Sequence, residues 1–87
     1  MITQQHLDQI GGLTESHSPS EALLGLLRQT FPGIHFTYCM DDDVIAASPV
    51  YEAAGFNLYL IDSRNHCLGF TQDKEVATGV VVAEIDE

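Results

Sequence analysis

Basic residues are scarce in this sequence, which has three lysines and arginines against thirteen aspartates and glutamates. The formal net charge of -10 repels phosphate backbones, and Arg28, Arg64 and Lys74 form no cluster that would neutralise them. We therefore expect no nucleic-acid partner and no anionic membrane surface as a partner. The summed negative field would instead attract a basic protein surface or a cation.

Long apolar segments and cysteines are also few. No stretch approaches the roughly 20 apolar residues of a membrane span, and the N-terminus lacks the charged-then-apolar pattern of a signal peptide. The two cysteines, Cys39 and Cys67, are too few for a disulfide framework and are expected to be reduced. We expect a soluble, cytoplasmic protein that forms one small domain over residues 1–87.

The N-terminal part, residues 1–32, has a helical pattern that predicts a helical hairpin. Gly11 and Gly12 are expected to end the first helix, because glycine disfavours a helix interior. Ser18 is the predicted N-cap of the second helix, which Pro32 and the glycine after it should stop. Apolar residues at near-helical spacing mark the two predicted helices: Leu7, Ile10, Leu13, Leu23, Leu26 and Leu27.

Beyond Pro32 the apolar period changes to two, so residues 33–87 predict an antiparallel sheet of three or four strands. The connections between strands are short, and parallel pairing would need long crossovers. With the two helices packed on one face, the expected class is α+β. The strand-like stretches are "IHFTYCM" (34–40), "FNLYLID" (56–62), "HCLGFT" (66–71) and "GVVVAEI" (79–85).

The second face of this predicted sheet is too apolar for a fully wet surface. It would carry Thr37, Cys39, Tyr59, Ile61 and Cys67. We expect this face to pack against a second copy of the chain, because a homodimer would enlarge the small core. The alternative is a monomer with scattered apolar residues on its surface.

The hairpin between the second and third predicted strands has an expected register. Placing Leu58 beside Phe70 on the helix-covered face requires Asp62 to oppose His66. The loop would then contain the three residues 63–65.

Histidines and cysteines suggest a metal site, with His35, Cys39, His66 and Cys67 as candidate ligands. On one strand His35 and Cys39 would lie roughly 13 Å apart, at ~3.3 Å per residue, which is too far to share one ion. His66 and Cys67 are neighbours and would point to opposite faces. A metal site would therefore have to form between strands, for example from Cys39 and Cys67.

The aspartate run, Asp41, Asp42 and Asp43, ends the first predicted strand and lacks the spacing of a calcium loop. It predicts either a solvated turn or an acidic loop that binds a partner, together with the irregular segment Val44–Gly55. The sequence has no nucleophile elbow, phosphate-binding glycine loop or dinucleotide fingerprint. We expect no enzyme activity and no cofactor.

Four stretches resemble a family of small, uncharacterised bacterial proteins encoded among nitrogen-fixation genes. They are "FPGIHFTYCMDDD", "GFNLYLID", "HCLGFT" and "VATGVVVAEID", and the likeness runs from Phe31 onward. The resemblance implies a role in nitrogenase maturation, protection or regulation, and it implies no catalytic residues.

The leading hypothesis is a non-enzymatic accessory module that binds another protein, such as a nitrogen-fixation component. The alternative is a metal or metallocluster carrier that uses Cys39 and Cys67. A redox sensor is a third hypothesis and would need one exposed thiol of low pKa.

Overall fold

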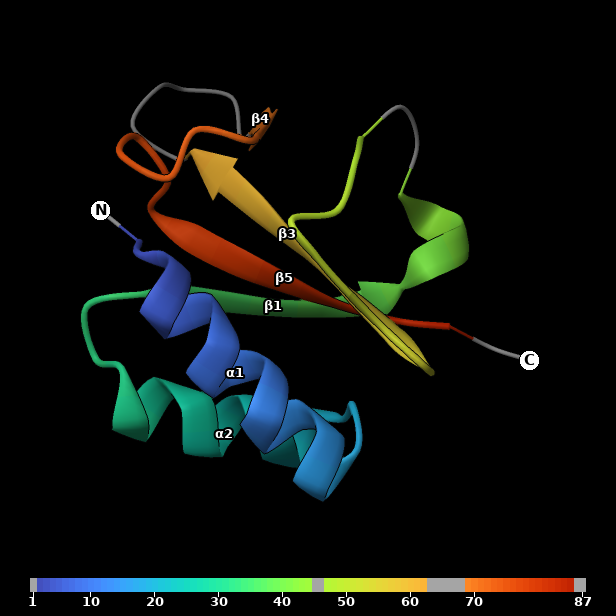
Figure 1. Cartoon of the computed structure of the whole chain (residues 1–87). Coiled ribbons are helices and arrows are strands. Elements are labelled where there is room, and N and C mark those ends of the chain that lie inside the picture. The colour runs from blue at the N-terminus through green and yellow to red at the C-terminus, as the bar shows by residue number, and fades with distance from the viewer. Residues whose placement is uncertain (1, 45–46, 63–68, 86–87) are drawn as a thin grey trace.

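The computed structural model describes residues 2–44, 47–62 and 69–85, and the elements below lie within these ranges. Two helices come first in the chain and are followed by the strands (Figure 1). The elements are α1 (Gln4–His17), α2 (Glu21–Thr30), β1 (His35–Met40), the 3-10 helix η1 (Asp41–Asp43), β2 (Tyr51–Ala53), β3 (Phe56–Asp62), β4 (Gly69–Thr71) and β5 (Gly79–Glu84).

The strands form one sheet in the order β1-β5-β3-β2, and β4 also pairs with β3. β1 and β5 run parallel, while every other pair is antiparallel. The prediction of a purely antiparallel sheet is therefore wrong. The last strand enters between the first and the third, and its residues from Gly79 to Ala83 are all buried. A strand buried on both faces is typically an unbroken apolar run, as in "VVVA", rather than an alternating pattern.

Both helices pack on one face of the sheet, the inner face, which confirms the α+β class (Figure 1). Each helix contributes one stripe of buried residues, and alternate strand residues meet them. The main members of this core are Leu7, Ile10, Leu23, Leu24, Leu27, Phe36, Phe56, Leu58, Leu60, Val80 and Val82.

Helix α1 continues through Gly11 and Gly12 to His17, so the prediction that these glycines end the helix is wrong. Gly11 is buried because the ring of Tyr51 lies directly against it. A Cβ at Gly11 would lie 2.6 Å from Cε1 of Tyr51, whereas a Cβ at Gly12 would meet nothing within 4 Å. The first glycine therefore makes room for an aromatic ring.

Replacing Gly11 with alanine should lower the free energy of unfolding by about 1 kcal/mol. Overpacking against Tyr51 costs about 1–3 kcal/mol, and the better helix propensity of alanine returns about 1 kcal/mol. Gly12→Ala, the matched control, should raise the stability by up to about 1 kcal/mol. Urea unfolding followed by circular dichroism measures both changes, and equal effects at the two positions would contradict the packing argument.

Helix α2 begins at Glu21, and its N-cap is Ser20, whose hydroxyl accepts a hydrogen bond from the Leu23 N–H at 3.2 Å. The prediction of Ser18 as N-cap is wrong, because Ser18 ends α1 with φ of 66°. The last turn carries Arg28, whose Nη2 donates to the carbonyl oxygen of Phe36 at 3.1 Å. This bond ties α2 to β1.

The register of β4 on β3 also differs from the prediction. Asp62 lies opposite Gly69 and Ile61 lies opposite Phe70. Phe70 therefore lies on the outer face, opposite to the helices, and not beside Leu58. His66, which was expected to oppose Asp62, lies outside the described residues.

Among the residues that the structure describes, no helix combines the length and the apolar character needed to cross a membrane.

Candidate functional site

The outer face of the sheet is apolar, as its alternating sequence predicted. The registers align Thr37, Val81 and Tyr59 in one row across β1, β5 and β3. Tyr59 is 4% exposed and Ile61 is 8% exposed, although α1 and α2 pack on the opposite side of the sheet. Tyr59, Ile61, Val81 and Ala83 form a second buried cluster, separate from the core beneath the helices.

Part of this face is covered by the chain that follows β1. Asp41, in η1, reaches across to β3, where its Oδ1 accepts hydrogen bonds from the Tyr59 hydroxyl at 2.7 Å and from Asn57 Nδ2 at 3.1 Å. Val44 and Ala47 then pack against the outer cluster. Asp41 is thus an anchor that holds this segment on the sheet.

The three aspartates therefore have different environments. Asp41 is half-buried and already hydrogen-bonded, whereas Asp42 and Asp43 are exposed. An anchored carboxylate is a poor contact for a partner, so the acidic surface offered by this loop is carried by Asp42 and Asp43. Partner binding by Asp41, Asp42 and Asp43 stays a prediction, and Asp42 and Asp43 are the exposed members of the run.

A groove lies on the outer face between η1 and β4, with a volume of about 290 Å³. Cys39, Ile61 and Val81 supply apolar atoms from the three long strands. Phe70, 47% exposed, is the large hydrophobic residue that the described chain leaves open to solvent. The lining of this outer-face groove is Thr37, Cys39, Asp43, Val44, Ile61, Gly69, Phe70 and Val81.

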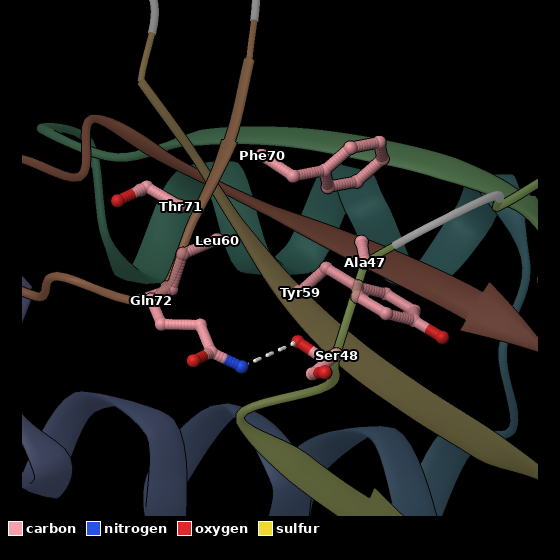
Figure 2. A pocket seen from close by; sticks show the side chains of 7 residues that line it. All are labelled: Ala47, Ser48, Tyr59, Leu60, Phe70, Thr71 and Gln72. Atoms are coloured by element: carbon pink, nitrogen blue, oxygen red, sulfur yellow. Dashed lines mark hydrogen bonds between the residues drawn. The ribbon is translucent and has the colours of Figure 1, made fainter.

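A second hollow of about 270 Å³ adjoins the groove, and Phe70 lines both. Figure 2 shows the rings of Phe70 and Tyr59 side by side, and their centroids are 5.7 Å apart in an edge-to-face contact. The Gln72 amide donates to the carbonyl oxygen of Ser48 at 3.5 Å across this hollow (Figure 2). Phe70 is therefore the side chain that links the two depressions.

Burial and nearby carboxylates raise the pKa values of two titratable groups on this face, Cys39 and Tyr59. Burial raises the pKa of the Cys39 thiol, and Asp43 and then Asp41 raise it further. Burial also raises the pKa of Tyr59, as does its hydrogen bond to Asp41. Both groups are therefore neutral near pH 7, which keeps the floor of the outer face uncharged.

The candidate metal ligands do not gather within the described part of the chain. His35 and Cys39 lie at opposite ends of β1, and no group of three His, Cys, Asp or Glu side chains there is placed to hold an ion. His66 and Cys67 lie outside the described residues. A metal-binding thiol must also lose its proton, which the raised pKa of Cys39 opposes.

Cys39 should react slowly with iodoacetamide at neutral pH, because alkylation requires the thiolate. In a Cys67→Ser variant, the alkylation rate of Cys39 should rise with pH as the thiol ionises. The pH midpoint of this rise should be higher for the folded variant than for the same variant unfolded in guanidinium chloride. Asp43→Asn should lower this midpoint by removing a nearby negative charge. A native midpoint at or below the denatured one would show that Cys39 is an activated thiol.

The sequence did not show that Asn57 and Tyr59 bind Asp41, or that Phe70 lies on this face. Asn57 and Tyr59 share a strand face, as their spacing indicates, but nothing local shows that Asp41 folds back onto them. Phe70 was assigned to the inner face because its strand was paired three residues out of the observed position, and an odd shift moves every side chain to the other face.

The chain was also compared with known proteins. A family model described as a family of unknown function (DUF6129) matches residues 6–85. No curated protein and no solved structure matches the chain. Because the match covers most of the chain, from the first turn of α1 through β5, the chain belongs to the DUF6129 family.

Proposed function

We propose that this chain is a non-enzymatic accessory module that binds another protein in the context of nitrogen fixation. The observation that carries the binding role is the outer face, where an apolar groove opens beside the exposed carboxylates of Asp42 and Asp43. Exposed apolar surface rimmed by polar groups is typical of protein interaction sites. The nitrogen-fixation setting rests on the sequence resemblance.

The chemistry of the outer face suits binding better than catalysis. Its cysteine is held as the neutral thiol, and its best-placed carboxylate, Asp41, is engaged by Asn57 and Tyr59. A nucleophile needs a base within hydrogen-bond reach, and His35 lies four residues from Cys39 on the same strand. Maturation, protection or regulation of nitrogenase would each require only that the chain recognise a protein component.

Affinity purification of the tagged chain from nitrogen-fixing cells tests this proposal. We expect a nitrogen-fixation protein to be recovered under fixing conditions, and the purified pair to bind in a reconstituted assay. Cells grown on fixed nitrogen provide the control. Recovery of the same proteins under both conditions, or of none that binds the purified chain, would contradict the proposed function.

The alternative, a metal carrier that uses Cys39 and Cys67, predicts that the purified protein contains bound metal, whereas the proposed function does not. We expect anaerobically purified protein to contain no stoichiometric transition metal by elemental analysis. The matched control is the double variant Cys39→Ser, Cys67→Ser, which should give the same metal content. A stoichiometric metal that disappears in this variant would establish the carrier function instead.

A further inference from the structure

The outer-face groove has a size that suits a protein side chain. Its volume of about 290 Å³ lies just below the roughly 300–1,000 Å³ found for small-molecule and cofactor pockets. Its floor is a sheet surface of Cys39, Ile61 and Val81, with Phe70 at one side. An apolar side chain can enter such a space, in the way that anchor residues enter pockets at protein interfaces.

The charge around the groove indicates the kind of segment that carries the anchor. Within the described part of the chain, the charged residue of its lining is Asp43, and Asp42 is exposed next to it. The whole chain has a net charge of -10 with three basic residues. Of these, Arg28 is bonded to the backbone of Phe36 on the helix side of β1.

A second copy of this chain fits the groove poorly because it carries the same negative charge. In a two-fold contact through the outer face, Asp42 and Asp43 of both copies would lie within one interface. Among the described residues, the groove lining offers no basic side chain to offset that repulsion. A partner with lysine or arginine beside its apolar anchor has the complementary charge.

We propose that the outer-face groove binds a basic segment of a partner protein, which seats one apolar side chain between Cys39, Ile61, Val81 and Phe70 and places its cations beside Asp42 and Asp43. This inference rests on the proposed binding function and names the partner chemistry. The neutral thiol of Cys39 suits an apolar floor. Lysine and arginine side chains beside the anchor would remain on the solvated rim, where they steer association.

A titration of the ¹⁵N-labelled protein with the peptide acetyl-KKFLKK-amide tests the groove directly. Backbone amide shifts should concentrate on β1, β5 and β4 around the groove, and α1 should be unaffected. Two control peptides separate the contributions: acetyl-KKGSKK-amide has the charge without the anchor, and acetyl-EEFLEE-amide has the anchor with the opposite charge. Both should bind at least about tenfold more weakly, a loss that corresponds to ~1.4 kcal/mol.

Variants of the protein provide the matched test. Phe70→Ser removes the exposed groove wall at little cost to the buried core, and Asp42→Lys with Asp43→Lys reverses the rim charge. Each should weaken binding of acetyl-KKFLKK-amide by about tenfold. Asp8→Lys with Glu15→Lys makes the same change in net charge on exposed positions of α1 and should change the affinity by less than about threefold.

Several results would overturn the inference. They are an absence of binding at millimolar peptide, shifts centred on another face, equal binding of acetyl-KKGSKK-amide, or equal weakening by both double-lysine variants. Groove shifts that grow with protein concentration alone, with a dimer mass in light scattering, would assign the groove to a second copy. If the variants capture the cellular partner as well as the native chain does, the proposed function stands and the groove assignment fails.

Discussion

Replacing Gly79 with alanine should lower the free energy of unfolding by about 2–3 kcal/mol. Overpacking of a filled site costs about 1–3 kcal/mol, and we expect the upper part of this range because the added Cβ would contact backbone. A Cβ at Gly79 would lie 2.8 Å from the carbonyl oxygen of His35 and 3.1 Å from Cδ1 of Ile61. That carbonyl belongs to the parallel partner strand β1, so it cannot rotate away as a side chain would. Chemical unfolding followed by far-ultraviolet circular dichroism measures the loss.

Gly69→Ala is the matched control for this substitution. Gly69 also lies in a strand, but it is exposed, and a Cβ there would meet no atom within 4 Å. Its stability should change by less than about 0.5 kcal/mol, as is usual for surface positions. If Gly79→Ala is as stable as the native chain, then β1 and β5 are not packed as closely as the structure shows.

Replacing Asp41 with alanine should cost about 1–2 kcal/mol, because two donors on β3 would lose their acceptor. Oδ1 of Asp41 receives both the Tyr59 hydroxyl and the Asn57 amide. Tyr59 is almost completely buried, so its hydroxyl has little access to water as a substitute. Asp41→Asn should lose less, because the amide retains a carbonyl oxygen that accepts hydrogen bonds.

The neighbouring Asp42→Ala is the control, since Asp42 is exposed, and its effect should lie within about 0.5 kcal/mol. A second measurement follows the Tyr59 ring resonances through an alkaline titration. Burial is the largest cause of the raised Tyr59 pKa, and the hydrogen bond and charge of Asp41 raise it further. Asp41→Ala should therefore lower the Tyr59 pKa. Equal stability losses in the two alanine variants, with an unchanged Tyr59 titration, would show that Asp41 is not an anchor.

The raised pKa of Tyr59 also has a consequence for the native chain. Its folded pKa lies above the unfolded value of about 10, so the unfolded state ionises first as the pH rises. The contribution of neutral Tyr59 to stability is therefore complete below about pH 10 and is lost as the pH rises through the folded pKa. Alkaline unfolding of the native chain and of Tyr59→Phe should diverge in this range.

Much of the architecture follows from local patterns that the sequence displays. The period of two in "IHFTYCM" assigns Phe36 to the inner face and Cys39 to the outer face, and the structure confirms both. The same alternation assigns Leu58 and Leu60 to the core and Tyr59 and Ile61 to the opposite cluster. These assignments succeed because a strand side chain's direction depends only on its own backbone.

Predictions about pairing failed where the deciding contact was distant in sequence. The parallel pair of β1 and β5 joins residues more than 40 positions apart, and the other edge of β5 pairs with β3. The β3–β4 register was predicted by placing apolar residues of the two strands opposite each other on the inner face. In the structure, Phe70 instead packs against Tyr59 on the outer face. Several pairings satisfied the local pattern, and packing of the whole sheet selected one.

The helix glycines and the aspartate run show the same division between sequence and tertiary structure. Propensity disfavours Gly11 inside a helix, but the ring of Tyr51 requires a residue without a side chain there. The sequence by itself determined a small acidic chain with two helices, a sheet and two apolar sheet faces, because composition and periodicity are local properties. Only the tertiary structure decided the strand order, the separate role of Asp41 and the position of the outer-face groove, because each depends on which distant segments pack together.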